Sequence, residues 1–367
     1  MNKPIKIILL SLLGVVLILV IAAFIGWRSI SSTFLDFEGE YTEKEDIQEL
    51  TLNGYTFMDR NGNGELDTYE DDRQPIESRV SDVLSQMTLE EKIHLLKGSG
   101  LASAIGAGKQ GEGIPGAVGT IVPTPRLGIP TIYLSDGPAG LRILPTREGD
   151  DKTYYCTAFP IATLIASTWN ESLALDIGGA MGNEALEYGI DVILGPGANI
   201  HRHPLCGRNF EYFSEDPFLT GHMGAAIING IESNGVGTSV KHFVANNQET
   251  ERFMNDVMIS ERALREIYLK GFEILVKKAQ PWTIMSSYNK INGTYTSESA
   301  YLLTDILRDD WGFEGLVMTD WFGGRDAVAQ VSAGNDLLEP GTNRQWKALI
   351  QGAENGDLST EVIDRAA

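Results

Sequence analysis

Charged and polar side chains recur directly after short apolar segments of this sequence. They are Asp136, the pair Lys241 and His242, Tyr288, and the pair Asp320 and Trp321. A sugar needs such a set, because its hydroxyls require charged hydrogen-bonding partners and its C–H faces require an aromatic surface. A carboxylate kept ionised by neighbouring positive charge can also attack an anomeric carbon as a nucleophile. These residues therefore predict a sugar pocket with a carboxylate nucleophile.

Each of these residues also has a simpler interpretation when taken alone. An Asp after a strand often caps the next helix, a Lys-His pair often lies in a solvated loop, and a Trp often packs in the core. The functional interpretation depends on joint placement, so the fold must bring the ends of the apolar segments to one face.

The apolar segments have the spacing of a repeated strand and helix unit. They are Thr131–Ser135, Val192–Leu194, Thr238–Val240, Thr283–Ser286, Leu316–Thr319 and Asp336–Leu338. Between two of them, residues 260–278 carry apolar side chains at spacings of three and four, which is typical of an amphipathic helix. Such units predict an α/β fold, a (β/α)8 TIM-type barrel over residues 76–358, whose strand ends share one pocket. An open doubly wound sheet is the alternative.

A helical region is expected at the start of this domain, from about Ile76 to Leu96. Thr88 and Glu91 have the spacing of a capping box, in which a hydroxyl and a carboxylate satisfy the first backbone amides of a helix. We therefore expect a break near Met87 and a second helix that begins at Thr88.

The composition is compatible with a neutral substrate. The chain has 367 residues, 43% of them hydrophobic, and a formal net charge of −21. Such a charge repels phosphate backbones, so we expect no nucleic-acid partner. Cys156 and Cys206 lack the spacing of a zinc or thioredoxin-type site, and both a disulfide and two free thiols remain open.

The N-terminus carries a long apolar run. Residues 7–27 contain no charged side chain, and a helix of this length would span about 30 Å, the thickness of a bilayer core. Lys3 and Lys6 precede the run and acidic residues follow it. The positive-inside rule then predicts that residues 1–28 anchor the protein in a membrane, with the remainder on the extracellular side. A cleaved signal peptide is the alternative.

A polar, acidic tether over residues 29–75 contains a loop that resembles the calcium loop of an EF-hand. Over residues 59–70, oxygen-bearing side chains, a glycine and an aliphatic residue have the EF-hand spacing. The candidate calcium ligands are Asp59, Asn61, Asn63, Glu65, Asp67 and Glu70. A polar turn that leads into the barrel is the alternative. A calcium ion here would be structural, and no cofactor is expected for catalysis.

The strand-end residues lie within longer motifs, which resemble those of glycoside hydrolase family 3. The motifs are Ser-Asp-Gly-Pro-Ala-Gly-Leu-Arg (135–142), Gly-Arg-Asn-Phe-Glu (207–211), Ser-Glu-Asp-Pro (214–217), Lys-His-Phe (241–243), Ser-Tyr-Asn (287–289) and Thr-Asp-Trp (319–321). The resemblance extends from about Ile76 to Gly341. It implies a barrel domain followed by an α/β sandwich domain.

The resemblance also implies a reaction and a role for each motif residue. The family contains exo-acting β-glycosidases, foremost β-glucosidases, which retain anomeric configuration and act on β-linked glucosides or short oligosaccharides. Asp320 matches the nucleophile that forms a covalent glycosyl–Asp intermediate. Tyr288 matches a residue that supports this nucleophile, and Trp321 matches a residue that lines subsite −1. The residues matched to contacts with sugar hydroxyls are Asp136, Arg142, Arg208, Lys241, His242 and Arg252.

The general acid/base has no match in this sequence. Single-domain N-acetylglucosaminidases of the family carry an Asp-His pair soon after Lys-His, and residues 243–252 contain none. The chain therefore resembles the two-domain branch, in which a Glu of the second domain is the acid/base. Glu211 and Glu249 are tempting substitutes, but nothing in the sequence assigns them this role.

The last residues predict an unfinished element. A helix-like segment begins near Ser359, and no C-terminal cap follows before Ala367. We expect residues 359–367 to begin a linker to a C-terminal sandwich domain, present in cis or supplied in trans. Without that domain the chain would be a slow or inactive enzyme. A carbohydrate-binding barrel without turnover is the alternative function.

Overall fold

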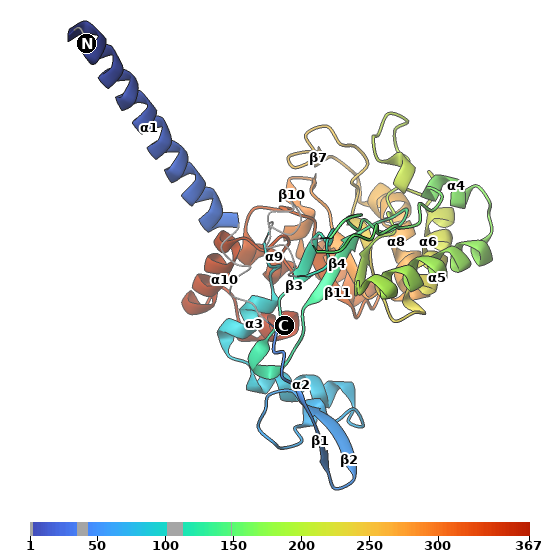
Figure 1. The fold of residues 1–367 in the computed structure, drawn as a ribbon. Helices are drawn as coiled ribbons and strands as arrows, with labels where there is room; N and C mark the ends of the chain where they lie inside the picture. Colours follow the sequence, from blue (N-terminus) through green and yellow to red (C-terminus); the bar gives the residue numbers. More distant parts are fainter. Residues whose placement is uncertain (1–2, 35–42, 101–112, 148) are drawn as a thin grey trace.

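The structure, a computed structural model, describes residues 3–34, 43–100, 113–147 and 149–367 (Figure 1). The α-helices are α1 (Lys3–Phe34), α2 (Ile76–Gln86), α3 (Leu89–Leu95), α4 (Ala162–Ala166), α5 (Glu171–Tyr188), α6 (Pro217–Glu232), α7 (Glu261–Ala263), α8 (Lys270–Ala279), α9 (Ala327–Ala333), α10 (Asn343–Asn355) and α11 (Thr360–Ala366). Two π-helical segments are η4 (Leu264–Tyr268) and η6 (Tyr301–Asp310). Short 3-10 turns are η1 (Thr68–Glu70), η2 (Pro125–Leu127), η3 (Asn209–Glu211) and η5 (Thr296–Glu298).

One six-stranded sheet organises the domain. Its strands, in chain order, are β3 (Gly119–Ile121), β4 (Ile132–Asp136), β5 (Val192–Leu194), β6 (Gly237–Phe243), β8 (Thr283–Ser286) and β11 (Leu316–Thr319). The spatial order is β11-β8-β6-β5-β4-β3, and β4 to β11 are parallel. Because parallel strands end on the same side, the residues that follow them meet at one edge.

Apolar side chains fill both faces of this sheet. Leu134, Leu194, Met285 and Met318 cluster on the concave side of the curled sheet. A larger cluster joins β6, β8 and β11 to α8 and η6 through buried residues that include Val240, Phe272 and Leu303. Helices α5, α6 and α8 lie beside one another against the sheet (Figure 1), with α6 between the other two. The parallel strands are therefore buried on both faces, which explains their continuous apolar sequences.

The expectation of eight parallel strands is wrong for the residues that the structure describes. The sheet has six strands, and β3 runs antiparallel to β4. Only a turn with η2 connects these two strands, and a parallel return would need a crossover of a dozen or more residues. The expected strand Asp336–Leu338 forms two isolated parallel bridges, Met318 with Leu337 and Lys97 with Leu338. The result is a curled half-barrel.

The predicted helices around the barrel are present. Met87 separates α2 from α3, and the Thr88 hydroxyl accepts a hydrogen bond from the Glu91 amide at 3.2 Å. The Glu91 carboxylate accepts in return from the Thr88 amide at 2.8 Å, so the capping box is confirmed. The helix expected over residues 260–278 is α7, η4 and α8, with a π-helical segment inside it.

The region expected to be a tether contains regular structure. Strands β1 (Gln48–Leu52) and β2 (Tyr55–Asp59) form an antiparallel hairpin directly before the calcium-like loop.

A second small sheet joins β7 (Asp256–Val257), β9 (Lys290–Ile291) and β10 (Thr294–Tyr295). The last helix, α11, buries Ile363 in the same apolar cluster as Ile93 of α3, so the end of the described chain packs on the domain.

The N-terminal helix α1 projects from the domain beside α10 (Figure 1). Its stretch Leu12–Ser32 has a mean hydropathy of 2.3 and is not buried. By length and composition this helix could cross a membrane, and an N-terminal signal sequence would meet the same criteria. The Asn343 side-chain amide donates to the Ser32 carbonyl at 3.0 Å, which is where α1 meets the domain.

Candidate active site

Asp136 and Lys241 meet across the edge of the sheet. Asp136 ends β4 and Lys241 lies in β6, and the Lys241 Nζ is 2.7 Å from the Asp136 Oδ1. Arg142 Nη1 contacts the other carboxylate oxygen at 2.8 Å. Burial would raise the pKa of Asp136, but Lys241, Arg142 and Arg208 outweigh it, and the net pKa lies below its usual value. Asp136 is therefore held in its anionic form by these neighbours.

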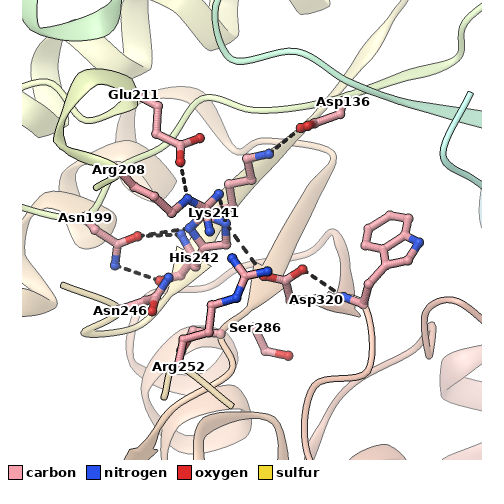
Figure 2. Close-up of polar contacts among 12 residues, drawn as sticks. Asp136, Asn199, Arg208, Glu211, Lys241, His242, Asn246, Arg252, Ser286 and Asp320 are labelled. Atoms are coloured by element: carbon pink, nitrogen blue, oxygen red, sulfur yellow. Dashed lines mark hydrogen bonds and ion pairs between the residues drawn. The ribbon is translucent and has the colours of Figure 1, made fainter. Parts of the chain in front are cut away.

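His242 is held in one orientation by neighbours on both ring nitrogens (Figure 2). Arg208 donates from Nη2 to His242 Nε2 at 2.9 Å, so Nε2 is the acceptor. Nδ1 then carries the hydrogen and faces Asn199 Oδ1 at 3.3 Å. Burial lowers the pKa of His242 well below its usual value, and Arg208, Lys241 and Arg252 lower it further. His242 is thus a neutral imidazole at the base of the site.

Asp320 lies next to this group, immediately after β11. Its side chain is buried, and its Oδ2 is 3.7 Å from His242 Nε2. Oδ1 accepts from the Trp321 amide at 2.8 Å. Burial raises the pKa of Asp320 above its usual value, although Tyr288, Arg208 and Lys241 oppose this rise. Positive charge lowers the pKa at both residues, but at Asp320 burial outweighs it and the net pKa is raised, because Asp320 is more completely removed from water.

Two glutamates orient the arginines of the site. Glu211 forms an ion pair with Arg208, whose Nε donates to the Glu211 Oε1 (Figure 2). Glu249 pairs with Arg252 Nη1 at 3.1 Å. Arg252 in turn lies over the ring of Tyr288, with the guanidinium 4.8 Å from the ring centroid. Both carboxylates are therefore engaged by arginines and are not free to face a leaving group, which argues against both glutamates as the acid/base.

Trp321 directly follows Asp320 and completes the arrangement. Its Nε1 donates to the Val118 carbonyl at 3.1 Å, and its side chain is partly buried. Tyr288, which follows β8, is buried near Asp320. The structure therefore brings together all nine candidate residues of the sugar site around one edge of the half-barrel. Their individual roles remain predictions.

Sequence reasoning missed two buried asparagines at this polar network, Asn199 and Asn246. Asn199 accepts from the His242 amide at 2.8 Å and donates to its carbonyl at 2.9 Å. Asn246 is buried, and its side-chain amide has no hydrogen-bond partner among the described residues. Asn199 follows β5 by a few residues. A search for polar residues shortly after apolar segments could therefore have found it. No sequence signal marks Asn246.

The calcium-like loop is tied together by its own side chains. Asp59 Oδ1 accepts from the backbone amide of Gly62 at 2.8 Å. The side-chain amides of Asn61 and Asn63 both donate to Asp67 Oδ2. Glu70 Oε1 accepts from the Arg60 amide at 2.6 Å, and Glu65 is exposed. In the described ranges, no three His, Cys, Asp or Glu side chains are grouped to hold a metal ion. Cys156 and Cys206 are both free thiols.

Comparisons with known proteins agree with the motifs. Residues 103–367 match the model of the glycosyl hydrolase family 3 N terminal domain. The thermostable β-glucosidase B of Acetivibrio thermocellus is 42% identical over 293 residues, which are 78% of this chain and 36% of that protein. An exo-α-(1→6)-L-arabinopyranosidase of Bifidobacterium longum is 48% identical over 244 residues, 65% of this chain and 32% of that protein.

Solved structures give the same result. β-Glucosidase 3B of Thermotoga neapolitana, in complex with α-D-glucose, is 52% identical and superimposes with a TM-score of 0.76, over 78% of this chain and 41% of that chain. The chain spans about a third of the length of the curated relatives it matches. Fold, motifs and comparisons agree: this chain belongs to glycosyl hydrolase family 3 and contains its N-terminal domain.

Proposed function

We propose that this chain carries the nucleophile of a retaining, exo-acting β-glucosidase. The observation that carries the proposal is the setting of Asp320, a buried carboxyl in one polar cluster with Asp136, Lys241, Arg208 and a neutral His242. The names of the β-glucosidases from Acetivibrio thermocellus and Thermotoga neapolitana support this substrate class.

The geometry suggests how the first chemical step would proceed. Asp136 would accept from substrate hydroxyls, while Lys241 and Arg208 would donate to them, which fixes the ring above Asp320. Asp320 Oδ1 is occupied by the Trp321 amide, so Oδ2 is the oxygen that would attack the anomeric carbon. A C–O bond to Oδ2 would form as the bond to the leaving group breaks, and water would later release the sugar with its configuration retained.

Departure of the leaving group requires a proton, and no described residue of the site is assigned as its donor. The two glutamates beside the site, Glu211 and Glu249, are paired with arginines. We propose that a carboxyl of a further domain, in cis or in trans, acts as the acid/base, a contribution that is typically about 10²–10⁴-fold. The alternative, a barrel that binds sugars without turnover, would share the pocket but form no covalent bond.

Trapping of the intermediate distinguishes these functions. We expect the full 367-residue chain, incubated with a 2-deoxy-2-fluoro-β-glucoside that carries an activated leaving group, to gain the mass of one fluoroglucosyl group. Such a leaving group departs without a proton, so the acid/base is not needed. The variant Asp320→Asn should gain no mass. Absence of a shift in the natural chain, with glucose binding retained, would favour the binding-only function.

The identity of the sugar is the next question. The relative from Bifidobacterium longum is named for an α-L-arabinopyranoside, so close relatives differ in substrate. A panel of aryl β-glucosides, β-xylosides, β-galactosides and α-L-arabinopyranosides, each with the same leaving group, would rank the sugars by kcat/KM. We expect the β-glucoside to rank first.

We also propose that α1 anchors the protein in a membrane, with the half-barrel on the extracellular side. The apolar stretch Leu12–Ser32 makes no buried contacts that would retain it in a soluble core. Intact-mass analysis of the protein from its native membrane tests this. Loss of the first ~25 residues would indicate a signal peptide instead.

A further inference from the structure

Glu339 is a buried residue in the extended segment that pairs with β11, the strand that Asp320 follows. It has no part in the site described so far. The Glu339 side chain is 0% exposed. Within the described part of the chain, neither of its carboxyl oxygens has a hydrogen-bond partner. An unpaired buried polar group costs roughly 1–3 kcal/mol, so its retention calls for a reason.

The strand register places this side chain level with the nucleophile. Met318 of β11 pairs with Leu337 in a parallel bridge, and both side chains lie in the apolar cluster on the concave side of the sheet. Side chains alternate along a strand, so residues two positions further point the same way. Those residues are Asp320 and Glu339. Their side chains therefore point to the same side of neighbouring extended segments.

The backbone of Glu339 holds the turn that carries Asp320. Its amide donates to the Thr319 Oγ1 at 2.9 Å, and its carbonyl accepts from the Phe322 amide at 3.0 Å. Thr319 precedes Asp320, and Phe322 follows Trp321. The segment around Glu339 thus fixes both ends of the turn that contains the nucleophile.

Two glycines make room for the Glu339 carboxyl. A side chain at Gly98 would collide with its Oε2. A Cβ at Gly119 would lie 3.0 Å from Oε1 and 2.6 Å from Cζ2 of the Trp321 ring. The carboxyl and the indole therefore share the space above Gly119.

We propose that Glu339 is a positioning residue of this active site, whose side chain supports the indole of Trp321 and whose backbone fixes the turn that carries Asp320. The inference rests on the proposed function, since it assigns a role in the reaction of Asp320. It predicts that sugar binding and attack by Asp320 both depend on the state of a side chain that does not touch the substrate.

The carboxyl would perform this role in its uncharged form. Burial raises the pKa of Glu339 well above its usual value, and Lys97 is the group that opposes this rise. Among the described residues, Lys97, from the segment after α3, is the ionisable group that acts on this carboxyl, and Asp320 follows the neighbouring strand β11. Residues 119–121 of β3 carry none. Ionisation at alkaline pH would place a negative charge near the nucleophile and disturb Trp321.

The test measures labelling by the activated 2-fluoroglucoside in the full chain, as kinact and Ki across pH. Glu339→Gln keeps the shape and cannot ionise, so we expect kinact and Ki within about twofold of the natural chain at neutral pH. At alkaline pH the natural chain should lose labelling rate while Glu339→Gln retains it. Glu339→Ala should lower kinact by about tenfold or more and raise Ki, because small displacements at a reacting centre are costly. Glu314→Gln, at an exposed position, is the matched control.

Each outcome decides the question. The same alkaline decline in the natural chain and in Glu339→Gln would overturn the proposal, whether or not Glu339→Ala folds. A folded Glu339→Ala with unchanged kinact and Ki would overturn it as well. If the natural chain is not labelled at all, the proposed function fails, and this inference fails with it.

Discussion

At the residue scale, burial and pairing divide the carboxyls of this site into distinct groups. Asp136 is held as an anion by Lys241 and Arg142, whereas Asp320 is buried against a neutral His242. Sequence reasoning identified both residues, because each directly follows an apolar segment. It could not predict that the pKa of Asp320 is raised, because this shift depends on how completely the folded chain excludes water.

The raised pKa of Asp320 gives a prediction for pH. A carboxyl whose pKa is raised loses its charge at a higher pH as the solution is acidified, and only the anion is a nucleophile. We expect kinact for the 2-fluoroglucoside to fall on acidification with a midpoint above 3.8, the ordinary value for Asp. A midpoint at or below 3.8, with the fold intact by circular dichroism, would contradict this.

The pairing of Glu211 with Arg208 gives a second prediction. Removal of the charge in Glu211→Gln should loosen Arg208 and, through it, the orientation of His242. Hydrogen bonds to charged groups contribute roughly 1.5–3 kcal/mol, so we expect Ki for the sugar to rise about tenfold or more.

Glu215→Gln, at an exposed position four residues along the chain, is the control and should bind normally. A contradictory result would be that Glu211→Gln binds the sugar normally and reacts more slowly only with substrates that have poor leaving groups. That pattern would make Glu211 the general acid, against the present account.

At the scale of elements, the strands were easier to predict than the barrel. The predicted bounds of β5, β8 and β11 match the structure, because strands buried on both faces have continuous apolar sequences between polar residues. The hairpin β1–β2 has no such signal, since its short strands, QELTL and YTFMD, mix apolar residues with charged and polar ones and are largely exposed. The antiparallel direction of β3 depends on a tertiary contact, the pairing with β4, which local sequence does not record.

The loop at residues 59–70 remains a predicted calcium site. Its side chains gather around Asp67 Oδ2, which two asparagine amides approach at 2.7 and 2.8 Å. Rotation of these amides would present oxygens to a cation. We expect isothermal titration with Ca²⁺ to show saturable heat for the natural chain and none for Asp59→Ala, with an increase in Tm only for the natural chain. Absence of heat in both would leave the loop as a polar turn.

At the scale of the whole molecule, the half-barrel holds the proposed nucleophile, and no described residue is assigned as the acid/base. The chain spans about a third of its curated relatives, so the activity of a longer protein is a proposal. If a further domain supplies the proton, the isolated chain should depend steeply on the leaving group. The comparison is the ratio of the rate for aryl glucosides with acidic phenols to the rate for alkyl glucosides. We expect this ratio to be about 10²–10⁴-fold larger for the isolated chain than for a complete two-carboxylate enzyme. Equal dependence would place the acid/base within this chain.

The most direct test of the central claim is the position of the trapped sugar. After labelling with the activated 2-fluoroglucoside, proteolysis and tandem mass spectrometry would locate the added mass within a peptide. We predict one fluoroglucosyl group on Asp320, which follows β11 in the Thr319–Trp321 motif. A label on Asp136, Glu211, Glu249 or Glu339, or one that persists in Asp320→Ala, would contradict the assignment of Asp320 as the nucleophile.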